Sequence, residues 1–202
     1  MATSTAQQQV DRIAEIWNEH LTVAQSLSLL SADVSRAVDV ICESLASGGQ
    51  LLVAGNGGSA ADAQHIAAEL TGRFLLERRP FRALALHANT SSLTAIGNDY
   101  GFEHVFAREV SAHARPGDVL LAISTSGHSR NVLLAIEEAR KVKLAVIGMT
   151  GEAGGKMTTT CDICLRVPSR STARIQEIHI TIGHAICELV ERRLAEDSLQ
   201  SH

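Results

Sequence analysis

Apolar residues in the first quarter of the chain recur every three or four positions, as they do along one face of an amphipathic helix. One set comprises Ile13, Ile16, Trp17 and Leu21, and a second comprises Leu27, Leu30, Val34, Val38, Ile41 and Leu45. We therefore predict two helices between about Val10 and Ala46, ended by the glycine pair at positions 48 and 49.

After residue 50, short apolar runs alternate with helical patterns. The runs predict strands at Leu51–Ala54, Ala83–Leu86, Val119–Ile123, Leu144–Gly148 and Ile163–Val167. The segments that follow them predict helices at Ser59–Leu76, Ser92–Ile96, Glu103–His113, Asn131–Lys141 and Thr172–Leu194. This alternation indicates an α/β fold, in which helices cover both faces of a parallel sheet and ligands bind beyond the carboxyl ends of the strands.

We expect a single domain over residues 1–202, since the chain shows no linker and no internal repeat. Its parts would be a helical segment at 1–47, an α/β core at 48–196 and a frayed tail at 197–202.

The composition excludes several classes of partner. The net charge is -4 with both signs interspersed, whereas nucleic-acid binding requires a basic stripe. No apolar run approaches the ~20 residues of a membrane span, and we find no signal peptide. We therefore expect a cytoplasmic protein that binds neither nucleic acid nor membrane.

The cysteine pattern gives a weak metal signal. Cys161 and Cys164 have the spacing of half a zinc site, but the chain has no second such pair. On the predicted fifth strand the two thiols would point to opposite faces of the sheet. We expect free, buried cysteines in a reducing compartment.

A glycine-rich loop, Gly55–Ser59, follows the first predicted strand and opens a helix. Glycines let backbone N–H groups approach a ligand closely, and a helix N-terminus favours anions. The alternatives are a plain tight turn or a dinucleotide site, because Gly55, Gly57 and Ala60 fit a relaxed fingerprint. A dinucleotide site also requires an acidic residue at the end of the second strand. The sequence has Leu86-His87-Ala88-Asn89 there, which argues against a dinucleotide site.

A second loop, Ser124-Thr125-Ser126-Gly127-His128-Ser129, follows the third predicted strand and also opens a helix. Its hydroxyls can donate hydrogen bonds to phosphate, and the helix dipole favours the negative charge. Alone, the loop could be an ordinary helix cap. Two such loops at one edge of the sheet favour a phosphorylated or polyhydroxylated ligand.

Four side chains could supply metal ligands or acid–base groups. His65 and Glu69 are four residues apart on a predicted helix, so they share one face. An imidazole and a carboxylate suit a divalent metal such as zinc or proton transfer, although an isolated pair of this kind is commonly a surface contact. Gln176 and His184 lie about two turns apart on the last helix, which is compatible with one edge of a cleft. By itself, His184 is typical of a partly buried structural histidine.

Longer segments resemble the signatures of the phosphoheptose isomerases over nearly the whole chain. They are Gly55–Arg73, Leu93–Phe102, Gly117–Gly127 and Thr172–His179. The resemblance implies the sugar-isomerase (SIS) fold, a three-layer, flavodoxin-like sandwich with a five-stranded parallel sheet, and a homotetramer. It also implies interconversion of sedoheptulose 7-phosphate and D-glycero-D-manno-heptose 7-phosphate, an early step towards nucleotide-activated heptose for bacterial envelope polysaccharides.

The resemblance also implies roles for individual residues. Glu69 would be the catalytic base, and His184 its partner acid or base. One zinc ion per subunit would be held by His65, Glu69, Gln176 and His184. The phosphate would be bound by Ser59, Ser124, Thr125, Ser126 and Ser129. The sugar would be bound by Asn56, Gly57, Gly58, Asn98 and Asp99, with Glu69 and Gln176 also at the substrate.

The chain departs from the family pattern at two substrate loops. The family usually has an acidic residue where this chain has His87-Ala88-Asn89, and an asparagine where it has His128. Two non-catalytic alternatives stay open: a relative that binds the bacterial replication initiator, and a sugar-phosphate sensor. The first should lack the counterparts of Glu69 and His184, and the second needs the phosphate loops without Glu69.

Overall fold

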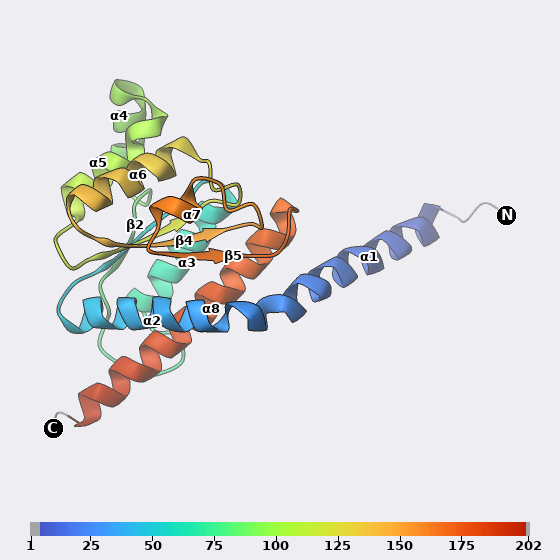
Figure 1. Cartoon of the computed structure of the whole chain (residues 1–202), viewed down its shortest axis with the longest axis horizontal. Helices are drawn as coiled ribbons and strands as arrows, with labels where there is room; N and C mark the ends of the chain where they lie inside the picture. Colours follow the sequence, from blue (N-terminus) through green and yellow to red (C-terminus); the bar gives the residue numbers. More distant parts are fainter. Residues whose placement is uncertain (1–4, 201–202) are drawn as a thin grey trace.

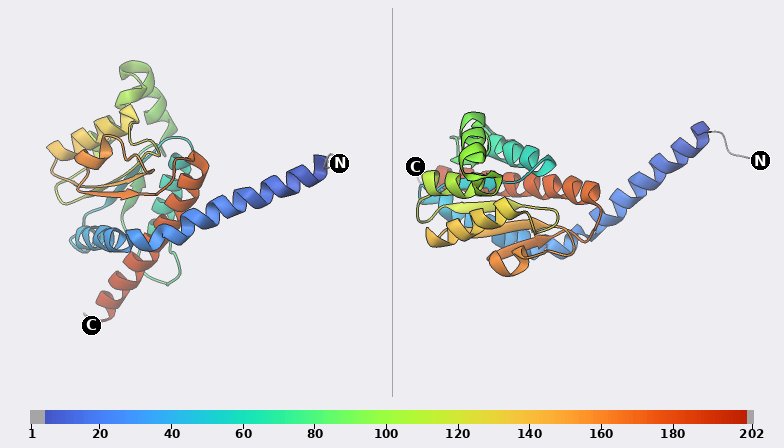
Figure 2. Two further views of the ribbon diagram at one scale, coloured as in Figure 1. Left: turned by 45° about the vertical axis from the view of Figure 1, so that its right-hand side comes forward. Right: turned by 90° about the horizontal axis from the view of Figure 1, so that it is seen from above.

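A computed structural model describes residues 5–200. The predicted N-terminal pair of helices is confirmed as α1 (Thr5–Gln25) and α2 (Ser31–Ala46), joined by the 3-10 turn η1 (Ser26–Leu30). Helix α1 buries none of its residues and extends away from the rest of the molecule (Figures 1 and 2). Its second half is held by α8 (Thr172–Gln200), where Arg174 donates to the carbonyl of Ile16 at 2.8 Å and His20 Nδ1 lies 2.8 Å from Glu177 Oε2.

The five predicted strands are confirmed and form one parallel sheet. They are β1 (Leu51–Ala54), β2 (Ala83–Ala85), β3 (Val119–Ile123), β4 (Ala145–Thr150) and β5 (Ile163–Arg166). The order is β2-β1-β3-β4-β5, with every pairing parallel, as in flavodoxin-like folds. The strand order reverses between β1 and β3, so the loops after these two strands lie together at the switch point.

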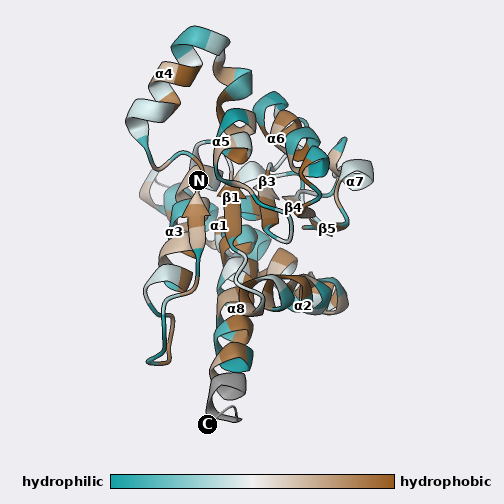
Figure 3. Ribbon diagram, turned by 90° about the vertical axis from the view of Figure 1, so that its left-hand side faces the viewer, coloured by the Kyte–Doolittle hydropathy of each residue, from teal (hydrophilic) through white to brown (hydrophobic). Residues whose placement is uncertain are grey.

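Helices cover both faces of the sheet, which gives the predicted three layers. On β1, Leu51 and Val53 face the core beneath α2, α3 (Gly58–Thr71) and α8. Leu52 and Ala54 face the other core, beneath α5 (Val105–His113) and α6 (Arg130–Lys141). The helical layer of α5 and α6 also includes α4 (Thr90–Tyr100), η2 (Phe102–His104) and α7 (Met157–Thr160). Strands β1 and β3 consist of hydrophobic residues only, whereas the helices carry polar and apolar faces (Figure 3).

Several element ends differ from the predicted ones. Helix α3 ends at Thr71 rather than Leu76, because the N–H groups of residues 74–76 donate to Glu191 on α8 instead of to helix carbonyls. Helix α4 begins earlier than predicted, at Thr90, because the Asn89 side chain accepts the N–H of Ser92 and caps it. The short helix α7 was not predicted. Helix α8 continues to Gln200 through most of the expected frayed tail, and residues 201–202 lie outside the described part.

The prediction that Cys161 and Cys164 point to opposite faces is wrong. Cys161 ends α7 instead of lying on β5, and both cysteines pack against the core beneath α6. Both are free thiols, and burial raises the pKa of Cys161 to about 12, so this thiol stays protonated. Within residues 5–200, no helix combines the length and the apolar character needed to cross a membrane.

Candidate active site

His65, Glu69 and His184 meet where α3 lies beside α8. The ligand atoms of the three side chains all lie within 4.8 Å of one another. His65 Nε2 is 3.0 Å from Glu69 Oε1 and 3.4 Å from His184 Nε2. The structure thus brings together two groups that the sequence placed 119 residues apart.

The donor set fits a divalent metal. The Nε2 atoms of His65 and His184 lie 3.4 Å apart, and an imidazole nitrogen that carries no hydrogen is a common zinc ligand. In a tetrahedral zinc site with bonds of about 2.0–2.1 Å, neighbouring ligand atoms lie roughly 3.3 Å apart. Two of the three separations, 3.0 and 3.4 Å, are close to this value, and the third, between Glu69 and His184, is at most 4.8 Å.

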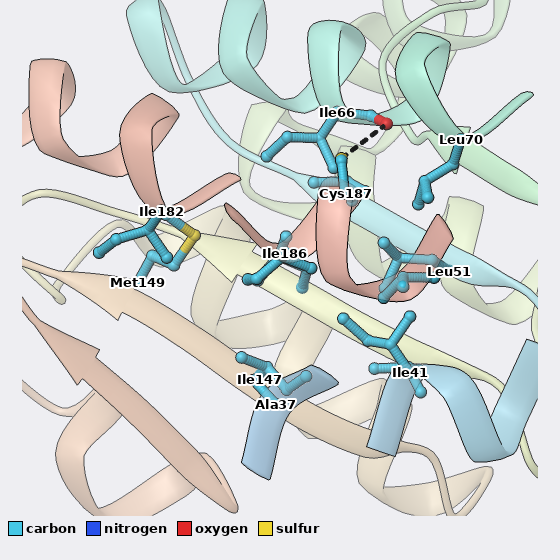
Figure 4. Packing of buried hydrophobic residues seen from close by; sticks show 14 of the residues in the cluster. Ala37, Ile41, Leu51, Ile66, Leu70, Ile147, Met149, Ile182, Ile186 and Cys187 are labelled. Carbon is cyan, nitrogen blue, oxygen red and sulfur yellow. Dashed lines mark hydrogen bonds between the residues drawn. The ribbon is translucent and has the colours of Figure 1, made fainter. Parts of the chain in front are cut away.

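Aliphatic packing beneath this cluster fixes the spacing of the two helices. Ile66 and Leu70 of α3 meet Ile182, Ile186 and Cys187 of α8 in the fully buried core (Figure 4). The Cys187 thiol lies 4.0 Å from the carbonyl oxygen of Ile66. Because this core is dense, the positions of His65, Glu69 and His184 are coupled to it.

The glycine-rich loop after β1 opens α3 and lies against Gln176. A Cβ atom at Gly58 would come within 2.7 Å of the Gln176 amide nitrogen, so only glycine allows the two to approach this closely. Gly57 precedes the helix with a φ of +57°, and the N–H of the buried Ser59 donates to the carbonyl of Asn56 at 3.0 Å. Gln176 therefore lies at the N-terminus of the helix that carries Glu69.

A reciprocal amide pair joins the loops of β1 and β3. Asn56 Nδ2 donates to Asn131 Oδ1 at 2.9 Å, and Asn131 Nδ2 donates back to Asn56 Oδ1 at 2.8 Å. Asn131 is buried in the first turn of α6, directly after the serine loop. Asn131 was not predicted from the sequence, although its place after that loop was a usable signal. Asn56, predicted to bind sugar, also ties the two loops together.

Hydroxyls converge in the loop after β3. Ser124 Oγ lies 2.9 Å from Ser129 Oγ and 3.5 Å from Ser126 Oγ. A cavity of about 300 Å³ adjoins the loop and is lined in part by Thr125, Ser126 and His128. The predicted phosphate-binding residues of this loop are thus clustered, and His128, which departs from the family pattern, lines the same cavity.

Asn98 and Asp99 are not part of this arrangement. Both are exposed on α4, where Asn98 Nδ2 donates to Asp99 Oδ1 at 2.8 Å. Helix α4 packs on α5 and η2 and projects at the top of the molecule in Figure 1, away from α1 and α8. Among the described hydrogen bonds, none links these two residues to the His65 cluster or to the loops of β1 and β3.

Two unusual titratable groups lie near the N-terminal half of α3. Burial raises the pKa of Asp62 to about 6, against an opposing effect of His65. Burial also lowers the pKa of His87, whose ring meets Phe106 edge-on at 6.4 Å between ring centroids. Within the described residues, neither Asp62 Oδ2 nor His87 Nδ1 has a hydrogen-bond partner.

Three residues around the cluster were not predicted from the sequence. The Phe74 ring lies 5.7 Å from the His184 ring, centroid to centroid. Arg78 and Glu191 form a buried ion pair at 3.0 Å that closes the segment after α3 onto α8. They are 113 residues apart, so sequence spacing gave no signal for the pair.

The chain is similar to known proteins along most of its length. The SIS domain family matches residues 18–151. A phosphoheptose isomerase of Rhodospirillum rubrum is 60% identical over 161 residues, which are 80% of this chain and 86% of that protein. One from Helicobacter hepaticus is 51% identical over 90% of this chain and 92% of its own length.

A solved structure agrees with these sequence relatives. The phosphoheptose isomerase of Neisseria gonorrhoeae superposes with a TM-score of 0.87 and 44% identity, covering 91% of this chain and 99% of that one. High identity, near-complete coverage and a shared fold lead to one assignment. The chain belongs to the SIS domain family and, within it, to the phosphoheptose isomerases.

Proposed function

We propose that the protein interconverts D-sedoheptulose 7-phosphate and D-glycero-D-manno-heptose 7-phosphate in the cytoplasm, with no nucleic-acid or membrane partner. The observation that carries this proposal is the meeting of Glu69, on the helix that follows the loop of β1, with His184 on α8. The family assignment supports the same reaction and a role in heptose biosynthesis, and we propose that the reaction is an early step towards activated heptose.

The reaction moves a proton between C1 and C2 of the sugar through an enediol. Glu69 would remove the carbon-bound proton, and His184 would give and take the proton on the neighbouring oxygen. Histidine suits this second role because its ordinary pKa lies near neutrality. Ser59 and the hydroxyls of the serine loop would hold the phosphate at the helix N-termini.

The remaining predicted residues would orient the sugar. Asn56, Gly57 and Gly58 lie in the loop that opens α3, and Gln176 lies against Gly58. Their amide and backbone groups could hydrogen-bond the hydroxyls of an open-chain sugar along the path from the phosphate to Glu69. This placement favours a polyhydroxylated substrate over a nucleotide.

We further propose one zinc ion per subunit, held by His65, Glu69 and His184 with Gln176 as an additional ligand. When bound, a divalent cation would polarise the substrate oxygen and stabilise charge on it. The test is metal analysis of protein purified without chelators, together with rates measured after chelation and after zinc is restored. Metal-free protein whose rate is insensitive to zinc would contradict the proposal.

A homotetramer is the proposed assembly. Helix α1 exposes Val10, Ile13, Trp17 and Leu21, at 45–66% of their surface and at helical spacing. Such an apolar stripe is typical of an interface between identical chains. Asn98 and Asp99 would take part in sugar binding only if the assembly brings α4 of one subunit to the cluster of another. A stable monomer in sedimentation at micromolar concentration would contradict this proposal.

The direct test of the function is conversion of sedoheptulose 7-phosphate by the purified protein, followed by NMR. We expect the heptose 7-phosphate to accumulate to equilibrium and unphosphorylated sedoheptulose to react far more slowly. A non-catalytic binding protein would bind the sugar phosphate without converting it, and that result would refute the proposal. The adjacency of Glu69 and His184 argues against this alternative.

A further inference from the structure

Glu191 makes an unusually complete set of contacts for a buried carboxylate. Its side chain is fully buried and accepts the N–H groups of Phe74, Leu75 and Leu76 at 2.8, 2.6 and 2.8 Å. Burial alone would raise the pKa of Glu191, but these hydrogen bonds and the charge of Arg78 lower it below its ordinary value. The carboxylate therefore stays ionised and draws the segment after α3 onto α8.

Arg78 extends this connection to the end of α3. Its Nε donates to Glu191 at 3.0 Å, and its Nη2 donates to the backbone carbonyl of Glu69 at 2.9 Å. Its Nη1 also donates to the carbonyls of Leu70 and Gly72 at 2.8 and 3.0 Å. The last carbonyls of a helix have no partners within the helix, so one guanidinium both caps α3 and fixes the peptide group of Glu69.

Glu191, which anchors this connection on α8, lies two turns from His184. Residues seven apart on a helix lie on nearly the same face, so Glu191 and His184 share the face of α8 that meets α3. Phe74, whose N–H is held by Glu191, places its ring beside that of His184. The buried ion pair of Arg78 and Glu191 thus links the backbone of Glu69 to α8. It also links Phe74, whose ring lies beside that of His184, to α8.

We propose that Glu191 and Arg78 are positioning residues that set the separation between Glu69 and His184. The inference rests on the proposed function, since it assigns them to the same reaction and metal site. Neither residue belongs to the reacting groups: both side chains are at least 96% buried, their polar contacts go to backbone atoms and to each other, and the Arg78 guanidinium stacks on the Phe81 ring at 4.1 Å. Their effect would reach the chemistry only through the positions of α3, Phe74 and α8.

Glu191→Gln tests this proposal, because it keeps the shape and removes the charge. We expect kcat to fall about 10–100-fold and the zinc dissociation constant to rise about tenfold or more, as for other residues that orient metal ligands. The KM for the sugar phosphate should change less than about twofold, since the serine loop is untouched. Zinc affinity is measured by competition with a chromophoric chelator, which does not depend on activity.

Asp118→Asn is the matched control. Asp118 is also a buried carboxylate, and it accepts the N–H groups of Gln50 and Arg115 at 2.9 and 2.8 Å. It precedes β3, at the edge of the sheet opposite to the active-site loops. This variant should lose comparable thermal stability while keeping wild-type kcat and zinc affinity. A similar fall of kcat in both variants would mean that general loosening of the fold, and not positioning, explains the effect.

Arg78→Lys keeps the experiment decisive if Glu191→Gln does not fold. Lysine retains the positive charge for Glu191 but cannot reach several α3 carbonyls at once. We expect the same loss of kcat and zinc affinity with a smaller loss of stability. Wild-type kcat and zinc affinity in the variants that fold would overturn the proposal. If the wild-type protein itself does not isomerise sedoheptulose 7-phosphate, the proposed function fails, and the zinc competition still tests the positioning role.

Discussion

Gly183→Ala should separate the catalytic helices without touching a catalytic side chain. Gly183 precedes His184 on α8, and a Cβ atom there would come within 2.8 Å of Ile66 Cδ1 and 2.9 Å of Ile66 Cγ1 on α3. Normal carbon–carbon contact is about 3.5–4.0 Å, so Ile66 or α8 must move by about 1 Å. Ile66 is fully buried, so the helices have to absorb part of this movement.

The expected loss of activity is much larger than the expected loss of stability. Alanine gains about 1 kcal/mol of helix propensity over glycine, while overpacking costs about 1–3 kcal/mol. The net destabilisation should thus be at most about 2 kcal/mol. A displacement of about 1 Å between reacting groups can lower the rate about 100-fold, so we expect kcat to fall by about 10–100-fold.

The assay compares kcat, zinc affinity and unfolding in urea for Gly183→Ala and Gly97→Ala. Gly97 lies in α4, where a new Cβ would meet only Val105, at an ordinary 3.9 Å. Gly97→Ala should raise the stability by up to about 1 kcal/mol and leave zinc affinity unchanged. A Gly183→Ala variant with wild-type kcat and zinc affinity would refute the view that the spacing of α3 and α8 sets the active-site geometry.

Three further predictions follow from single contacts. Ser126→Ala should raise KM for the sugar phosphate by about 10-fold or more, since a hydrogen bond to a charged group contributes about 1.5–3 kcal/mol. An unchanged KM would mean that the phosphate binds elsewhere. Asn131→Ala breaks the amide pair with Asn56, so it should raise KM more than it lowers zinc affinity; equal effects on both would contradict this. Burial lowers the pKa of His179 to about 4, so from pH 7.5 to 5 the unfolded chain gains a proton that the folded chain does not. The free energy of unfolding should therefore fall by about 2 kcal/mol from pH 7.5 to 5. In His179→Gln, the free energy of unfolding measured in urea should lack this pH-dependent fall.

The sheet was predictable because local patterns determine it. The apolar runs of β1 and β3 are buried on both faces, which is the pattern that a central parallel strand requires. The end of α3 was not predictable from such patterns. Its sequence remains compatible with a helix to Leu76, but Glu191, from the other end of the chain, takes the N–H groups that would continue it.

In the active site too, local patterns predicted some residues, whereas contacts between distant residues were not predictable. The i, i+4 spacing placed His65 and Glu69 together, and the family resemblance, rather than spacing, joined them to His184. Arg78 and Glu191 were missed because each acts through a residue far away in sequence, whereas the place of Asn131 directly after the serine loop was a signal that could have been used. The distant position of Asn98 and Asp99 on α4 could not be foreseen either, because sequence motifs give the residues of a site without giving their places within one subunit.

Solvent deuterium exchange tests the central claim most directly. Glu69→Gln keeps the size of the side chain and removes the base. In heavy water, the wild-type protein should incorporate deuterium at C1 or C2 of the sugar phosphate during isomerisation. The variant should still bind the sugar phosphate, but it should neither isomerise it nor incorporate deuterium. Exchange at the wild-type rate in Glu69→Gln would contradict the account, because another group would then have to be the base.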